Sequence, residues 1–198
     1  MNPTDLRHYI RVYDGALDGP FCQRMIQSFH ALAQYQKPNG RGVREGLDLS
    51  SWTELNVTRL SDPAFMTMVR SRIDAALERY NRDIGLGIPL PHSGLIDNLV
   101  MKRYRPGTNE RFQVHFDALY NFANRYLVIL WYLNDVDEGG ETVFPQLDYS
   151  VAARTGRLLI FPPYWMYQHE GMPPLSGEKY ILSTYLLFAS SPTVAQAS

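Results

Sequence analysis

The sequence predicts a mainly β protein: a jelly roll, or double-stranded β-helix, with two N-terminal helices packed on one sheet. Beyond residue 94, short apolar runs follow one another, separated by Gly- and Pro-containing turn signals. Several short strands without helices between them indicate antiparallel sheets and not a βαβ fold, and a jelly roll is one closed solution. The 198 residues suit one domain. We expect residues 1–94 to form helical support and a substrate loop, and residues 95–189 to form the jelly-roll core.

The first helix is predicted from its start signal and its periodicity. Asp18 is a typical cap, and Pro20 is tolerated in a first turn. Apolar residues then recur at helical spacing through residues 21–33. Ahead of this helix, alternating side chains at residues 9–13 predict an edge strand.

A second helix is predicted further along the same half. Ser61 or Asp62 caps it and Pro63 opens it. Its apolar face runs through residues 65–80, and Gly85 marks its end.

Between the two helices, residues 37–51 are rich in Gly and charged side chains and are expected to form a mobile loop. Because loop charges are usually solvated, Arg41 and Arg44 are only weak candidates for substrate contact. A short strand is expected at residues 52–60.

Six further strands are expected after residue 94. They are predicted at residues 95–104, 111–117, 125–135, 142–144, 157–161 and 179–188. Turn signals such as Pro106-Gly107 and Thr155-Gly156 separate them.

Composition excludes several function classes. The net charge of −1 argues against a non-specific nucleic-acid or membrane-surface binder, because phosphate contacts need clustered Lys and Arg. The single Cys22 excludes an intramolecular disulfide, and the first residues lack a signal-peptide pattern. We therefore expect a reducing, cytoplasmic setting. The longest apolar-rich run, at residues 126–133, is too short to span a bilayer.

Two histidines and one aspartate form the candidate catalytic site. His115 and Asp117 stand two residues apart, so on one strand both side chains would point to the same face. His169 follows another strand-like run and a loop. Two imidazoles and a carboxylate can occupy one face of an octahedral metal and leave the other open, as in non-haem Fe(II) oxygenases, although zinc accepts the same donors. A His-x-Asp pair alone is weak, and its combination with His169 and Lys179 gives it weight.

The order of short motifs in the second half of the chain is more specific than any one of them. The motifs are Tyr104-x-Pro-Gly, His115-x-Asp, Tyr132-Leu-Asn, a Glu-Gly-Gly-Glu-Thr-x-Phe-Pro run at residues 138–145, His169 and Lys179. This order resembles that of the Fe(II)/2-oxoglutarate dioxygenases, and within them the prolyl 4-hydroxylase branch. The resemblance covers residues 100–189, about half of the chain.

The resemblance implies cofactors and roles. Fe(II) would be bound by His115, Asp117 and His169, with 2-oxoglutarate and O₂ as cosubstrates and ascorbate as a possible reductant. Lys179 falls where the family places the cation for the C5 carboxylate of 2-oxoglutarate. Tyr104 and Tyr132 match tyrosines that contact the cosubstrate, and Thr142 matches a pocket-lining position. From the residues alone, both tyrosines could equally be core aromatics.

The implied reaction is hydroxylation of an unactivated C–H bond with release of succinate and CO₂. Asp117 favours hydroxylation over halogenation, because related halogenases carry a small residue there. The resemblance favours prolyl residues of a peptide or protein, or a free amino acid, as substrate, and not nucleic acid. Aromatic residues near the expected mouth could stack on a substrate ring or pack at the rim; they are Tyr120, Phe122, Tyr164, Trp165 and Tyr167.

Two other classes remain as alternatives. A non-catalytic jelly-roll module would use the pocket for ligand binding, but the intact set of His115, Asp117, His169 and Lys179 argues against such decay. A cupin-like metalloenzyme shares the barrel, but the His-x-His pair typical of cupins does not occur in the sequence.

Overall fold

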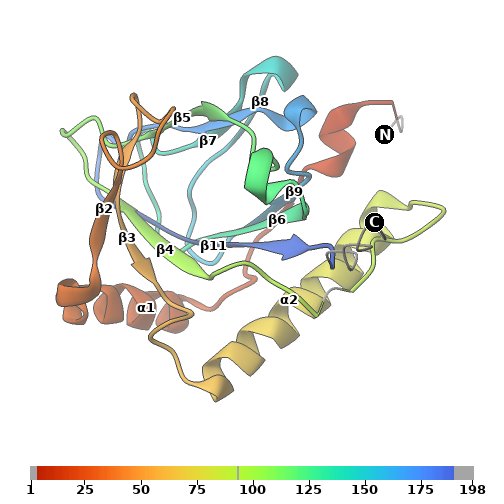
Figure 1. The fold of residues 1–198 in the computed structure, drawn as a ribbon, viewed down its shortest axis with the longest axis horizontal. Coiled ribbons are helices and arrows are strands. Elements are labelled where there is room, and N and C mark those ends of the chain that lie inside the picture. Colours follow the sequence, from red (N-terminus) through yellow and green to blue (C-terminus); the bar gives the residue numbers. More distant parts are fainter. Residues whose placement is uncertain (1–3, 93, 190–198) are drawn as a thin grey trace, which may run out of the picture.

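Two antiparallel sheets lie face to face, and two α-helices cover the outer face of the larger one (Figure 1). The computed structural model describes residues 4–92 and 94–189. The larger sheet has seven strands in the order β1-β9-β6-β11-β4-β3-β2, and the smaller has four in the order β5-β10-β7-β8. This architecture confirms the predicted mainly β jelly roll with helices on one sheet.

The larger sheet takes strands from both halves of the chain. Its members are β1 (Arg11–Tyr13), β2 (Lys37–Gly40), β3 (Ser51–Asn56), β4 (Val100–Tyr104), β6 (Arg125–Tyr132), β9 (Leu158–Phe161) and β11 (Lys179–Leu187). The smaller sheet comes from the second half alone. Its members are β5 (Phe112–His115), β7 (Thr142–Phe144), β8 (Tyr149–Val151) and β10 (His169–Gly171).

Both predicted α-helices are confirmed, with the expected caps. In α1 (Gly19–Ala31), the Asp18 carboxylate accepts a hydrogen bond of 2.7 Å from the Phe21 amide. In α2 (Pro63–Ile84), Asp62 is the cap, and Gly85 ends the helix in the left-handed conformation at φ 63°. Short 3₁₀-helices are η1 (Leu6–Tyr9), η2 (Ala33–Tyr35), η3 (Tyr120–Phe122), η4 (Pro145–Leu147) and η5 (Trp165–Tyr167). Across the described residues, every helix is too short or too polar to cross a membrane.

Apolar side chains separate into two layers on either side of the larger sheet. The helices bury residues such as Phe29 and Leu77 against its outer face, together with Leu182 of β11. The inner layer lies between the sheets and includes Phe144 and Ile181. Because successive side chains of a strand point to opposite faces, odd-numbered residues of β11 point into the space between the sheets.

Several predicted boundaries were wrong. The segment expected as one loop at residues 37–51 begins with edge strand β2, because residues 37–40 pair with β3. The strand predicted at 95–104 is regular only from Val100. Strands β8 and β10, three residues each, were not predicted, because segments this short carry too little alternation to stand out.

Candidate metal centre

The three predicted ligands come together between the sheets. His115 ends β5, His169 begins β10, and the two residues are direct partners in the antiparallel pairing. Nε2 of His115 lies 3.6 Å from Oδ1 of Asp117, and Nε2 of His169 lies 3.5 Å from Oδ2. Within the described part of the chain, these three side chains form the group of His, Cys, Asp or Glu residues that could hold a metal ion. Their ligand atoms all lie within 4.8 Å of one another.

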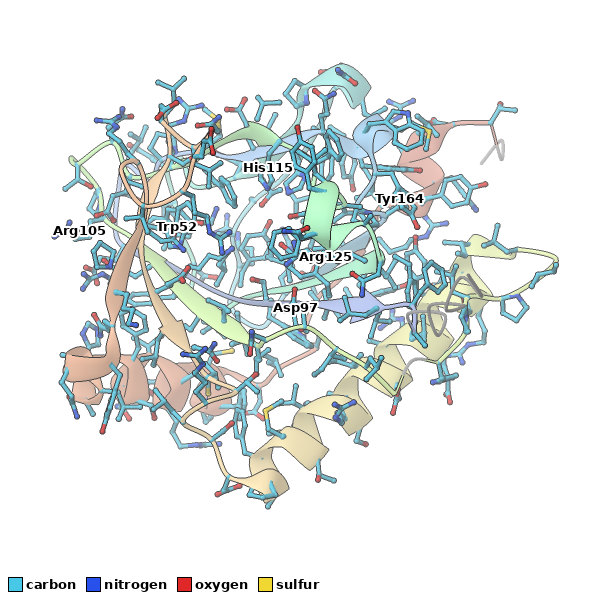
Figure 2. The ribbon with its side chains drawn as sticks, in the orientation of Figure 1. Trp52, Asp97, Arg105, His115, Arg125 and Tyr164 are labelled. Atoms are coloured by element: carbon cyan, nitrogen blue, oxygen red, sulfur yellow. The ribbon has the colours of Figure 1, made fainter. Side chains whose placement is uncertain are left out.

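Asp117 reaches the site in a way that the sequence did not predict. Strand β5 stops at His115, so Asp117 lies in the bend that follows and not on the strand. Its amide donates a hydrogen bond of 3.0 Å to the carbonyl of Pro163, and its own carbonyl accepts one of 3.2 Å from Arg125. Arg125 also bonds to Asp97 through Nε at 3.1 Å. Figure 2 shows Arg125 and Asp97 close together, below His115 in that view.

Both imidazoles are oriented by backbone carbonyls. Nδ1 of His115 lies 2.8 Å from the Gln113 carbonyl oxygen, and Nδ1 of His169 lies 3.1 Å from that of Tyr167. Since a carbonyl only accepts, each Nδ1 carries a proton, and each Nε2 is the ring nitrogen that faces the centre. Burial, with His115 adding to it, lowers the pKa of His169 to about 4, so this ring is neutral at pH 7.

The carboxylate of Asp117 has one oxygen satisfied and one free. Oδ1 accepts a hydrogen bond of 2.7 Å from the hydroxyl of Tyr185, whereas Oδ2 is buried and has no hydrogen-bond partner among the residues that the structure describes. Burial alone would raise the pKa of Asp117, but His169, His115 and the Tyr185 hydroxyl hold it well below its usual range. A buried anionic oxygen without a partner is costly unless a cation binds it. Two imidazole donors and this oxygen therefore fit a divalent metal.

Lys179 lies in the same cavity, at the start of β11. Its side chain is buried, with Nζ 5.4 Å from the ring centre of Tyr104, its pairing partner on β4. Burial lowers the pKa of Lys179 to about 7, although Glu141 partly offsets the effect. No ion pair to Lys179 is found among residues 4–92 and 94–189. The cavity thus contains a buried cation that an anionic ligand would neutralise.

The remaining predicted residues are placed differently from one another. Tyr104 and Thr142 line the same cavity as the candidate ligands and Lys179. Tyr132 is fully buried and does not line the cavity, but its hydroxyl donates a hydrogen bond of 2.7 Å to Oγ1 of Thr142. Tyr132 therefore reaches the cavity through the Thr142 hydroxyl.

Sequence reasoning missed three residues of the site: Lys102, Arg125 and Tyr185. Two of them carried a usable signal. Tyr185 stands six residues after Lys179 on one strand, so it shares a face with it, and Lys102 stands two before Tyr104. Arg125 is brought in by a loop contact, which no local pattern indicates.

The five aromatic residues predicted near the mouth of the cavity differ in solvent exposure. Tyr120, Phe122 and Trp165 are exposed, and Tyr164 is partly buried. Tyr167 is buried in the inner layer and cannot contact a substrate at the mouth.

Comparison with known proteins agrees with this geometry. The sequence profile of the 2OG-Fe(II) oxygenase superfamily matches residues 99–187, a segment that holds His115, Asp117, His169 and Lys179. This stretch of the chain is therefore similar to the 2OG-Fe(II) oxygenase superfamily. The chain is also 30% identical over 130 residues to the probable prolyl 4-hydroxylase 11 of Arabidopsis thaliana, an alignment that covers 61% of this chain and 44% of that one. The chain thus spans less than half the length of the curated relatives it matches.

Solved structures of prolyl hydroxylases share the fold. The viral collagen prolyl hydroxylase of Paramecium Bursaria Chlorella virus-1, in its 2OG complex, superposes with a TM-score of 0.60 at 20% identity, covering 92% of this chain and 97% of that one. A Trichoplax adhaerens prolyl hydroxylase in complex with a peptide fragment of hypoxia inducible factor gives 0.71 at 17% identity, covering 94% and 87%. At such identities the likeness concerns the fold.

Proposed function

We propose that the protein is an Fe(II)- and 2-oxoglutarate-dependent dioxygenase that hydroxylates an unactivated C–H bond. One observation carries the proposal: the Asp117 carboxylate lies beside two oriented imidazoles, and its buried Oδ2 has no hydrogen-bond partner among the described residues. The same cavity is lined by Lys179, which forms no ion pair within that part of the chain. A metal centre beside a buried cation suits a cosubstrate that chelates metal at one end and carries a carboxylate at the other. The sequence motifs and the superfamily match support the same reading.

In this proposal the chain's own residues hold and orient the reactants. His115, His169 and Asp117 would hold Fe(II), which when bound supplies O₂ activation coupled to conversion of 2-oxoglutarate to succinate and CO₂. Lys179 would neutralise the distal carboxylate of the cosubstrate as a point charge. Tyr104 and Thr142 would line its binding site, with Tyr132 orienting the Thr142 hydroxyl.

For the substrate we propose prolyl residues of a peptide or protein, or a free amino acid. The names of the relatives support prolyl chemistry, and the Trichoplax adhaerens structure holds a peptide. The exposed Tyr120 and Trp165 would give a pyrrolidine ring surfaces on which to stack. We further propose that residues 1–198 form one domain, since both halves share the larger sheet. The single cysteine is in keeping with work in the reducing cytoplasm, and ascorbate is proposed as the reductant.

Succinate formation tests the proposal. The protein is incubated with Fe(II), ascorbate, air and 2-oxoglutarate, with proline-containing peptides, free amino acids or no addition, and with His115→Ala as the blank. Succinate above the blank is the expected result. A protein that binds neither metal nor 2-oxoglutarate would contradict the proposal, and turnover that persists without O₂ would favour a cupin-like enzyme.

A further inference from the structure

The lysines of this protein are few and unevenly placed. The chain has three lysines against sixteen arginines. Lys37 is exposed on β2, whereas Lys102 and Lys179 both line the cavity of the metal centre. Lys179 has a role in the proposed function, and Lys102 has none.

Lys102 stands beside the metal ligands. It lies on β4, two residues before Tyr104, so its side chain points between the sheets. Its Nζ is 5.4 Å from the ring centre of Trp52 and 5.3 Å from that of Phe112. The Phe112 ring in turn stacks on His115 at 3.8 Å. Two aromatic faces thus hold the ammonium group next to the metal-binding imidazole.

Lys102 forms no ion pair within residues 4–92 and 94–189. Glu54, its cross-strand partner on β3, and Asp117 act on its charge without direct contact. Glu54 is held by Trp52, whose Nε1 donates to it at 2.8 Å, and the carboxylate of Asp117 faces the two histidines. Arg44, on the loop between β2 and β3, adds further positive charge that acts on Lys102. A buried or half-buried ammonium in such a place requires an anion.

The cosubstrate does not supply that anion. A divalent metal, the Asp117 carboxylate, the Lys179 ammonium and a dianionic 2-oxoglutarate together carry no net charge. Among the charged groups that line the cavity, Lys102 therefore leaves one positive charge, because its cross-strand partner Glu54 is not part of the lining. The remaining component of the complex is the substrate.

We propose that Lys102 binds a free carboxylate of the substrate and so selects a carboxylate-bearing substrate, a free amino acid or a peptide with a free C-terminus, over an internal residue of a chain. The inference rests on the proposed function and narrows it. In the bound complex the ammonium would hold the carboxylate beside the metal, and the reacting C–H would belong to the same residue or the next one. Arg44 would add a long-range attraction to the same group.

Lysine NMR tests this proposal directly, because three lysines give three separable signals. The protein is labelled at lysine Cε, loaded with diamagnetic Zn(II) and 2-oxoglutarate, and titrated with the common amino acids and their primary amides. A short proline-containing peptide is added in free-acid and amidated forms. We expect at least one free acid to shift the Lys102 signal and to bind at least tenfold more tightly than its amide. The peptide pair distinguishes a chain terminus from a free amino acid.

Variants separate the charge of Lys102 from its packing. Lys102→Met keeps the apolar stem against Trp52 and Phe112 but removes the charge, and should weaken binding of the selected acid about ten- to hundredfold, as for hydrogen bonds to charged groups. Lys102→Arg should restore part of the affinity, and the exposed Lys37→Met should change nothing.

Three results would overturn the proposal: equal binding of acids and amides, no binding of any acid, or a loss of 2-oxoglutarate affinity in Lys102→Met as large as in Lys179→Met. The last result would make Lys102 a cosubstrate anchor. Failure of the proposed function would show earlier and separately, as failure to bind the metal or 2-oxoglutarate before any substrate is added.

Discussion

The hydroxyl of Tyr185 donates a hydrogen bond of 2.7 Å to Oδ1 of Asp117. Burial, together with the charge of Asp117, raises the pKa of Tyr185 well above its ordinary value, so the hydroxyl keeps its proton and acts as the donor. This bond occupies Oδ1 and leaves Oδ2, which lies 3.5 Å from Nε2 of His169, available to a metal ion. Tyr185 is therefore a positioning residue for the metal centre.

Removing this hydroxyl should weaken metal binding. Tyr185→Phe keeps the ring but leaves Oδ1 without its donor, and losing a hydrogen bond to a metal ligand typically costs about 10- to 100-fold in metal affinity. Competition titration with a chromophoric chelator, using Zn(II) and Fe(II) under nitrogen, would measure the change. Tyr35→Phe, at a half-exposed tyrosine far from the ligands in sequence, is the matched control. Equal metal affinity of Tyr185→Phe and the wild type would exclude the positioning role.

The histidine ligands can be tested by metal content. His115→Ala and His169→Ala each remove one of three donors, so we expect purified variants to hold far less than one Fe(II) or Zn(II) per chain. Metal should also raise the melting temperature of the wild type and not that of the variants, because a ligand stabilises only a protein that binds it. His92→Ala, an exposed histidine paired with Asp74, serves as the control. Full metal occupancy in either ligand variant would refute the assignment.

Cosubstrate affinity should depend on pH through Lys179. Burial lowers the pKa of Lys179 to about 7, and only the charged form can pair with a carboxylate. Binding of 2-oxoglutarate therefore takes up a proton above pH 7, and its affinity should fall by up to about tenfold per pH unit there while staying level below pH 7. Calorimetry on the Zn(II)-loaded protein in buffers of different ionisation enthalpy would show the proton uptake.

A conservative variant isolates the contribution of Lys179. Lys179→Arg keeps the positive charge at every pH in this range, so its 2-oxoglutarate affinity should lose the pH dependence. Lys179→Met should bind 2-oxoglutarate weakly at all pH values while still holding metal. The same pH profile in Lys179→Arg as in the wild type would assign the titration to another group.

Gly156 is predicted to be essential for stability. It has φ +74°, and a Cβ added there would lie 2.0 Å from the carbonyl oxygen of Leu17. The same residue links two segments, because its amide donates to Tyr132 and its carbonyl accepts from Leu17. Gly156→Ala should cost about 1–3 kcal/mol of unfolding free energy, which lowers the melting temperature by about 2–4 °C for each kcal/mol. Gly177→Ala, where an added Cβ meets nothing within 4 Å, is the control and should be nearly neutral.

Local features of the chain were predictable because they depend on neighbours in sequence. Asp18 and Asp62 cap their helices as short polar side chains do anywhere, and Gly85 ends α2 because it accepts a left-handed conformation. The three candidate ligands that the structure brings together were also predicted from residue types and motif order. Imidazole and carboxylate donors retain their preference for metal whatever the fold around them.

The tertiary structure decided the features that depend on distant contacts. Asp117 is held beyond the end of β5 by Pro163 and Arg125, and Tyr185 reaches it from a strand 68 residues away. The alternation of side chains along a strand predicts that Lys179 and Tyr185 lie on the same face. It does not predict that this face contacts Asp117. Likewise, the sequence does not show that the ammonium group of Lys102 lies between the rings of Trp52 on β3 and Phe112 on β5. Sequence alone determined which chemical groups were present, and folding determined which of them were buried, paired or left without a partner.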